Sequence, residues 1–241
     1  MLASMLEALI FDVDGTLADT ERDGHRPAFN AAFAAAGLDW HWDAALYGEL
    51  LAVTGGKERI RFFCERHAPE FLQQANVEAR IKELHAAKTR HYVDLCAQGI
   101  PLRPGVERLL REASAAGLRL AIATTTTPEN ITALLPPDLL ALFEKVGAGD
   151  TVPNKKPAPD IYQWVLAQLA LPAAACLAIE DSANGLKASR AAGLATVVTR
   201  TAYTDDHDFT GALALLPDLG EVTVPLLRHW HDTAYDGDKK S

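Results

Sequence analysis

Residues 9–20 read LIFDVDGTLADT, and the interpretation of the whole chain depends on this stretch. Apolar residues run directly into Asp12 and Asp14, which are followed by Gly15 and Thr16. A carboxylate at the end of a buried strand costs free energy unless something pairs with it, coordinates it or uses it. The plain alternative is a strand followed by a glycine turn, with both aspartates solvated or capping a helix. The two interpretations differ in what they predict for the ends of the other strands.

The composition is that of a globular protein with an acidic surface. The 241 residues can form one large domain, or one domain that carries a second, inserted one, and 49% of them are hydrophobic. The net charge of −9 argues against nucleic acid or an anionic membrane as a partner. The three cysteines form no CxxC pair, which favours reduced, buried thiols.

The first residues, MLASMLEALIFDVD, contain no basic segment of the kind that precedes a secretory signal. Apolar runs in the sequence are too short to span a bilayer. We therefore expect a soluble, cytoplasmic protein, and we expect it to be a monomer whose partner is a small molecule.

Strand-like segments alternate with helical ones through most of the chain, which indicates an α/β fold with a parallel sheet flanked by helices. The expected strands are Ala8–Phe11, Leu118–Ala123, Lys145–Gly147, Cys176–Ile179 and Ala195–Val198. The expected helices between them are Gly105–Ala116, Pro128–Leu135, Pro159–Ala170 and Ser182–Ala192. The polar residues 231–241 are expected to fray.

The interval from about residue 21 to residue 99 differs from the rest, because it contains helical periodicity and no convincing strand. The expected helices are Arg26–Ala36, Asp43–Leu51, Lys57–His67 and Val77–Leu95. We predict an α/β core made of residues 1–19 and 100–241, with residues 20–99 inserted after the first strand as a small α-helical cap.

Polar groups follow three of the expected strands, where ligands bind in open parallel sheets. Asp12 and Asp14 follow the first strand, Thr124–Thr127 the second, and Glu180-Asp181-Ser182 the fourth. The proline-rich loop NKKPAPD adds Lys155 and Lys156. Each group alone is explained as well by helix capping or solvation. Together they would require several coincidences at one edge of a sheet, which favours a functional site.

These residue types suit phosphate chemistry. Asp12, Asp14 and Asp181 offer the hard oxygen ligands that Mg²⁺ prefers, and a metal ion there would explain why carboxylates crowd together. Threonine hydroxyls, amides at a helix N-terminus and a lysine are the groups that a transferring phosphoryl group needs.

The stretches FDVDGT, a threonine after an apolar strand, KPAPD and IEDS, in this order, resemble the four motifs of the haloacid dehalogenase superfamily. The helical insert is similar to that of its subgroup with an α-helical cap on a Rossmann-like core. Within it the chain resembles phosphoglycolate phosphatases, β-phosphoglucomutases and, most of all, CbbY-like sugar-bisphosphate phosphatases. Haloacid dehalogenases lack the second aspartate of the DxD motif, so Asp14 favours phosphoryl transfer over dehalogenation.

The resemblance implies a role for each motif residue. Asp12 would be the nucleophile that forms an aspartyl-phosphate. Asp14 would protonate the leaving group and then accept a proton from water. Mg²⁺ would be held by the Asp12 side chain, the Asp14 backbone carbonyl and Asp181, with Glu180 behind them. The implied phosphoryl-binding groups are Thr124, the amide of Thr125, and Lys156, with Lys155 as the less favoured lysine.

In the cap, the stretch VTGGKERI at residues 53–60 resembles the substrate-specificity loop of CbbY-like proteins. The residues expected to bind substrate there are Thr54, Gly55, Gly56, Lys57 and Arg59, together with Glu21. Roles for His25, Lys88, Arg90, Arg103 and Asn130 stay open. The alternative is a helix start with solvated charges. A second cationic group in the cap suggests a substrate with two phosphates, and the resemblance implies xylulose-1,5-bisphosphate.

Three other functions remain open. A β-phosphoglucomutase-like mutase would return the phosphate from the same aspartyl-phosphate to a sugar. A phosphoglycolate phosphatase needs only one phosphate site and would leave TGGKER unexplained. A non-catalytic phosphate-sensing protein would be expected to lack Asp12 or Asp14, and both are present.

Overall fold

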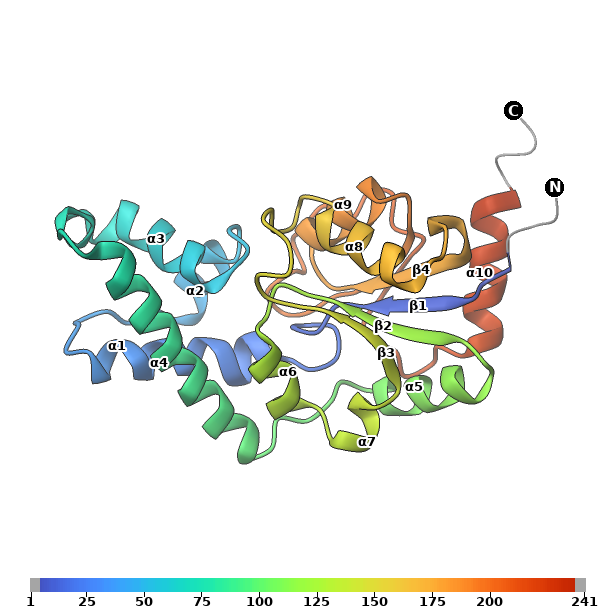
Figure 1. Ribbon diagram of the computed structural model, residues 1–241, viewed down its shortest axis with the longest axis horizontal. Coiled ribbons are helices and arrows are strands. Elements are labelled where there is room, and N and C mark those ends of the chain that lie inside the picture. Colours follow the sequence, from blue (N-terminus) through green and yellow to red (C-terminus); the bar gives the residue numbers. More distant parts are fainter. Residues whose placement is uncertain (1–4, 237–241) are drawn as a thin grey trace.

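A six-stranded parallel sheet forms the centre of the core in a computed structural model that describes residues 5–236, and the helices α1 to α4 lie to one side of it (Figure 1). The strand order is β3-β2-β1-β4-β5-β6. The strands are β1 (Ala8–Phe11), β2 (Arg119–Ala123), β3 (Phe143–Gly147), β4 (Cys176–Glu180), β5 (Ala195–Thr199) and β6 (Ala214–Leu216). The first five lie where the sequence predicts them, to within two residues at each end.

Helices cover both faces of the sheet, which explains why its central strands are apolar throughout. Alternate residues of β1 pack on opposite faces: Leu9 and Phe11 on one, Ala8 and Ile10 on the other. Side chains of α5 (Val106–Ala115), α6 (Pro128–Leu134) and α10 (Val224–Asp236) bury the first face. Those of α8 (Asp160–Leu169) and α9 (Ala183–Ala191) bury the second. Two short elements, α7 (Pro137–Leu140) and η3 (Ala173–Ala175), complete this part.

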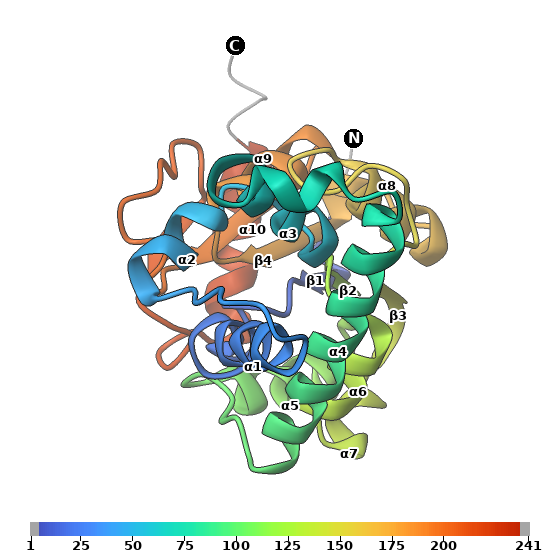
Figure 2. The ribbon, with the colours of Figure 1, turned by 90° about the vertical axis from the view of Figure 1, so that its left-hand side faces the viewer.

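The chain between β1 and α5 is helical, with an apolar cluster of its own. It comprises η1 (Glu21–His25), α1 (Arg26–Ala35), α2 (Ala44–Leu50), α3 (Gly56–His67), η2 (Pro69–Gln73) and α4 (Val77–Ala97). Phe29, Phe33 and Trp42 lie at the centre of the cluster and contact one another through their rings. When the helical insert faces the viewer, α1 to α4 lie in front of the ends of β1 and β2 (Figure 2). The α/β fold with a helical insert is thereby confirmed; the exact limits at residues 20 and 99 stay predictions.

The C-terminal part of the core differs from the sequence expectation. Residues 231–236 belong to α10 instead of fraying, because Leu227 and His231 are fully buried and His231 Nε2 donates to Ala174 O (2.8 Å). Residues 237–241 lie outside the described part of the chain. Strand β6 was not expected, since three residues at a sheet edge carry almost no periodicity.

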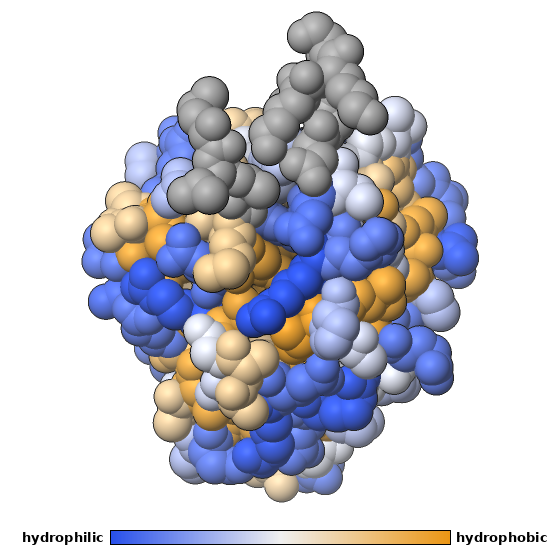
Figure 3. Space-filling model, turned by 90° about the vertical axis from the view of Figure 1, so that its right-hand side faces the viewer, coloured by the Kyte–Doolittle hydropathy of each residue, from blue (hydrophilic) through white to orange (hydrophobic). Residues whose placement is uncertain are grey.

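The end of the core remote from the cap carries apolar side chains interspersed with hydrophilic ones (Figure 3). The three cysteines are free and buried, as expected. Among residues 5–236, no helix is both long enough and apolar enough to cross a membrane.

Candidate active site

Lys156 holds Asp12 at the carboxyl end of β1. The Lys156 ammonium donates to Asp12 Oδ1 (2.6 Å), Glu180 Oε1 (2.6 Å) and Ala123 O (2.9 Å), so it joins the ends of three strands. Lys155 turns away and pairs instead with Asp150 (2.8 Å). Burial would lower the pKa of Lys156, but the two carboxylates outweigh it and raise the pKa above its usual value. The lysine therefore stays charged beside Asp12.

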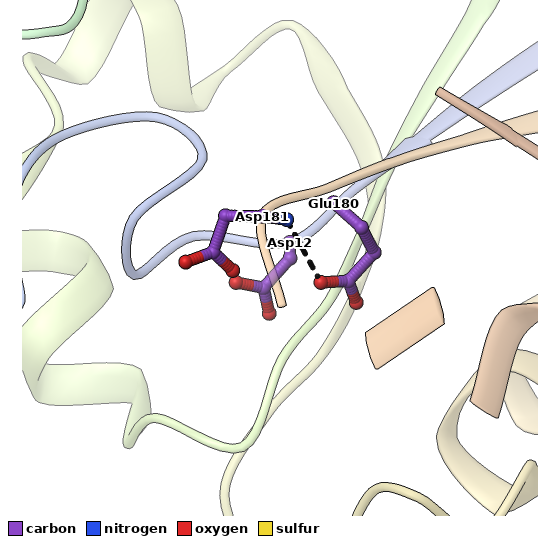
Figure 4. A group of neighbouring side chains, drawn as sticks. All are labelled: Asp12, Glu180 and Asp181. Carbon is purple, nitrogen blue, oxygen red and sulfur yellow. Dashed lines mark hydrogen bonds between the residues drawn. The ribbon is translucent and has the colours of Figure 1, made fainter. Parts of the chain in front are cut away.

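Three buried carboxylates crowd around this lysine. Asp12, Glu180 and Asp181 each offer an oxygen within 4.8 Å of the others, and the Asp181 amide donates to Glu180 Oε2 (3.2 Å; Figure 4). Burial raises the pKa of Asp12 to about 7; Lys156 opposes this shift and Glu180 adds to it. Burial and the charges of Asp12 and Glu180 also raise the pKa of Asp181 well above its usual value. Positive charge at this point would stabilise the ionised forms.

The donor set fits Mg²⁺, which prefers carboxylate and carbonyl oxygens. Gly15 shapes the space beside Asp181: its φ is +82°, and a β-carbon there would lie 2.1 Å from Asp181 Oδ2. Only glycine allows this approach without strain. Asp12 and Asp181 are the side chains that would hold the ion, and the Asp14 carbonyl lies on the same turn.

Asp14 begins a chain of hydrogen bonds that leads into the cap. Thr20 Oγ1 donates to Asp14 Oδ1 (2.6 Å), and His25 Nε2 contacts the same oxygen (2.8 Å). Lys88 Nζ donates to His25 Nδ1 (2.6 Å), which leaves the Nε2 proton for Asp14. Burial would raise the pKa of Asp14, but the interactions with His25 and Thr20 outweigh it and hold the pKa below its usual value. Burial lowers the pKa of Lys88 to about 8.

Sequence reasoning left His25 and Lys88 without a role, because they lie 63 residues apart. The available signal was weak: Lys88 interrupts the apolar face of its helix. The contact between η1, which ends at His25, and α4, which carries Lys88, brings the pair together.

The polar residues after β2 and β4 divide between capping and the site. Thr127 and Ser182 are the N-caps of α6 and α9 and accept hydrogen bonds from Asn130 N and Gly185 N. For these two residues, helix capping was the alternative explanation that the sequence offered. Thr124 is buried and lines the pocket together with Thr125. Ser182 and Asn184 at the start of α9 line the same pocket, whereas Asn130 in the first turn of α6 lines an adjoining chamber.

The pocket lies between the sheet and the cap. Asp12, Asp14, Lys156 and Asp181 line its core side, and Glu21, Thr54 and Arg59 its cap side. Arg59 is buried; its Nη1 donates to Tyr47 Oη (2.8 Å) and lies 3.6 Å from Glu21 Oε2. Tyr47 Oη in turn donates to Glu21. Arg59, the second cationic group of the pocket, is therefore held by Tyr47 and Glu21. The sequence did not indicate a part for Tyr47.

The remaining predicted cap residues divide into two groups. Gly55 and Gly56 face an adjoining chamber with Lys88 and Asn130, and a β-carbon on Gly56 would collide with the His85 ring (2.6 Å). Lys57 instead pairs with Asp150 of the core (2.8 Å) at the outer seam, away from Asp12. Arg90 is exposed, and Arg103 binds backbone carbonyls.

A wall of the pocket that the sequence did not indicate comes from the loop after β5. Thr201, Tyr203, Thr204 and His207 line the pocket, and Tyr203 packs edge-on against Tyr47 (5.7 Å between centroids). Asn184 at the start of α9 donates to Ala52 O and Thr54 Oγ1 of the cap (both 3.2 Å). These contacts hold the cap over the strand ends.

Comparison with known proteins places this geometry in a family. The profile of haloacid dehalogenase-like hydrolases matches residues 6–193. A CbbY protein of Cupriavidus necator is 54% identical over 229 residues, which cover 93% of this chain and 90% of the relative. The CbbY protein of Rhodobacter capsulatus is 52% identical over 224 residues, covering 91% of this chain and 96% of the relative.

A solved structure of CbbY from Rhodobacter sphaeroides in complex with phosphate is 45% identical and superposes with a TM-score of 0.84, covering 92% of this chain and 99% of that one. A mutant of the same protein was solved in complex with xylulose-(1,5)bisphosphate, with the same identity, coverage and TM-score. A β-phosphoglucomutase from Clostridium difficile shares the fold at 20% identity (TM-score 0.79). The chain therefore belongs to the haloacid dehalogenase-like hydrolases, and it is a phosphatase of CbbY type within that family.

Proposed function

We propose that this protein is a Mg²⁺-dependent phosphatase that converts xylulose-1,5-bisphosphate to xylulose-5-phosphate and phosphate through an aspartyl-phosphate. The observation that carries the proposal is the pair of buried cationic groups on opposite walls of one pocket, Lys156 beside Asp12 and Arg59 in the cap. They provide charge for a phosphate at each end of a substrate. The xylulose-(1,5)bisphosphate complex of a CbbY relative supports the choice of sugar.

The chemistry follows from the placement of the two aspartates. Asp12 attacks phosphorus, the bond to the sugar oxygen breaks, and Asp14 gives that oxygen a proton. A water molecule then attacks the aspartyl-phosphate and passes a proton to Asp14, which frees phosphate and restores Asp12. Asp14 is ionised in the resting protein, so it first takes up a proton from solvent, which the arrival of a phosphate dianion favours, and the attacking water returns that proton in each cycle.

The rest of the pocket binds and excludes water. Lys156 and the hydroxyl and amide groups of Thr124 and Thr125 face the position of the reacting phosphoryl group. Mg²⁺, when bound, supplies positive charge that offsets the carboxylates and phosphate oxygens. The cap contacts from Asn184 and Tyr203 close the pocket over the substrate.

Arg59 and Lys57 are expected to behave differently when truncated. Arg59→Ala removes the cap cation that faces the pocket, and we expect kcat/KM for the bisphosphate to fall roughly ten- to a hundredfold, the size of a lost charge-assisted contact. Lys57→Ala, in the same helix, removes an exposed pair with Asp150 and should change kcat/KM less than about threefold. The measurement is phosphate release from xylulose-1,5-bisphosphate and from p-nitrophenyl phosphate.

Activity on the aryl phosphate is the control, because it needs no distal contact and reports an intact core. Parallel loss on both substrates in Arg59→Ala would show that the cluster of Arg59, Tyr47 and Glu21 is structural. A wild-type protein that prefers monophosphates would contradict the bisphosphate assignment. Isotopic oxygen from water appearing in the released phosphate distinguishes a phosphatase from a mutase.

Asp14→Asn tests the proton transfer. The variant should lose about 10²- to 10⁴-fold in kcat/KM for sugar phosphates, whose leaving alkoxide needs a proton. Its kcat/KM for p-nitrophenyl phosphate should fall much less, because nitrophenolate leaves without one. A rapid first equivalent of nitrophenolate followed by slow turnover is expected, since the water step still lacks its base. Equal losses on both substrate types would mean that Asp14 does not act as the acid.

A further inference from the structure

Arg103 is a buried side chain of the core that does not line the pocket holding Asp12. Its guanidinium donates to backbone carbonyls and to one side-chain hydroxyl at the base of three loops. Nη1 donates to Gly15 O and Thr199 Oγ1 (3.0 Å), and Nη2 donates to Arg200 O and Pro217 O (both 2.6 Å). A buried guanidinium with these acceptors is a rigid anchor, because its planar fork fixes the direction of each bond.

Arg103 holds the turn that carries Asp14 in two ways. Its side chain donates to the carbonyl of Gly15, the residue after Asp14, and so fixes the Gly15 peptide. Its backbone amide donates to Leu17 O (2.8 Å). The turn is closed by a bond from Gly15 N to Ala18 O (2.9 Å). On its other side, Gly15 packs so closely on Asp181 that a β-carbon would lie 2.1 Å from Oδ2. The Gly15 peptide is thus clamped between Arg103 and Asp181.

We propose that Arg103 is a positioning residue for Asp14: by fixing the Gly15 carbonyl it sets the direction from which the Asp14 carboxyl meets the leaving oxygen. Arg103 touches neither substrate nor the reacting atoms. A small rotation of the Gly15 peptide moves the neighbouring Asp14, and misplacement of a catalytic group by about 1 Å can cost about a hundredfold in rate. The proposal rests on the role of Asp14 in the proposed function.

Arg103 also contacts parts of the site other than the turn that carries Asp14. It follows Leu102, which forms an antiparallel bridge with Ala18, so that the two connections between core and cap run side by side at this point. Thr199 and Arg200 lead directly into the loop that forms the pocket wall opposite. The catalytic turn, the cap connections and this wall therefore share one anchor.

The test is Arg103→Lys, which keeps the charge but replaces a two-sided fork by a single ammonium. Arg108→Lys is the matched control, because Arg108 also donates to three backbone carbonyls, those of Leu219, Gly220 and Val222, none of which belongs to the turn that carries Asp14. kcat/KM is measured over phosphate monoesters whose leaving groups range from nitrophenol to simple alcohols. Thermal unfolding of both variants is measured alongside.

We expect kcat/KM of Arg103→Lys to fall about ten- to a hundredfold on alkyl phosphates but less than about threefold on p-nitrophenyl phosphate. Only alkoxide leaving groups need the proton that Asp14 supplies. Arg108→Lys should leave the dependence on leaving group unchanged. In the Asp14→Asn background, Arg103→Lys should have no further effect on that dependence. Thr199→Val, which removes one acceptor of Arg103, should shift the dependence in the same direction and serves if Arg103→Lys does not fold.

A uniform loss over all leaving groups, or a loss that adds fully to that of Asp14→Asn, would overturn the proposal and leave Arg103 as a stabilising residue only. A wild-type protein without activity on any monoester would contradict the proposed function instead. The two failures are therefore distinguishable.

Discussion

The Asp12→Asn protein is expected to fold normally and to release phosphate at least about 10⁴-fold more slowly than the wild type, because an amide cannot attack phosphorus and removal of a nucleophile typically costs this much or more. The measurement is phosphate release in the presence of Mg²⁺ from both an aryl and a sugar phosphate. Both substrates should fail equally, since both must form the aspartyl-phosphate. Rapid quenching of the wild type should in turn show a phosphorylated protein that the variant does not form.

The fold should survive because the substitution relieves a cluster of like charges. Burial raises the pKa of Asp12 to about 7, from 3.8, so its ionisation destabilises the metal-free folded protein progressively as pH rises from about 4 to 7. At pH 8 without metal, Asp12→Asn should therefore unfold at a temperature equal to or above that of the wild type. Near pH 4 this gain should vanish.

Asp150→Asn is the control for this first prediction, because Asp150 is an exposed carboxylate that pairs with Lys57 and Lys155 outside the pocket. It should retain near-normal turnover on aryl phosphates. Phosphate release by Asp12→Asn at a rate close to the wild type would show that another group is the nucleophile.

The core strands could be predicted because burial on both faces leaves a clear apolar record in the sequence. β6 and the last turns of α10 could not, for different reasons. β6 has three residues at the edge of the sheet, too few for a period to show. The end of α10 is polar in sequence, yet His231 is buried by a contact with the distant Ala174, which no local pattern contains.

The residues of the site also differ in whether the local sequence could predict them. Asp12, Asp14 and Asp181 follow strands, so the topology of a parallel sheet was enough to expect them at one edge. Lys57 and Arg59 are two residues apart on α3 and looked equivalent, but only Arg59 faces the pocket. Their difference follows from the rotation of α3 against its neighbours, which depends on packing and not on the local sequence.

The contacts of His25, Lys88 and Arg103 could not be predicted, for a further reason. Each of these side chains is buried and makes a polar contact with a residue at least 11 positions away, whereas a charged residue in a helix or loop is ordinarily exposed. The sequence alone does not show that these side chains are buried. A buried charge with a full set of partners points either to a structural anchor or to the functional site.

The second large effect is expected from removal of the metal. In excess chelator the wild type should lose essentially all activity on every phosphate monoester, and Mg²⁺ should restore it. Asp12, Glu180 and Asp181 lie within 4.8 Å of one another around a single lysine, so a phosphate dianion would otherwise enter a site of the same charge. Ca²⁺ should inhibit, because its larger and looser shell misplaces the nucleophile relative to phosphorus.

Binding of Mg²⁺ can be followed without turnover, since an ion that binds only the folded state raises the unfolding temperature. The wild type should show this rise, and Asp181→Asn should lose most of it together with activity. Asp150→Asn, which lacks a carboxylate outside the cluster, should keep both. Full activity in excess chelator would contradict the metal site, and an unfolding shift that persists in Asp181→Asn would place the ion elsewhere. Because the raised pKa of Asp181 is caused by burial beside Asp12 and Glu180, the Mg²⁺-dependent shift should also weaken as pH falls and protons compete with the ion for these oxygens.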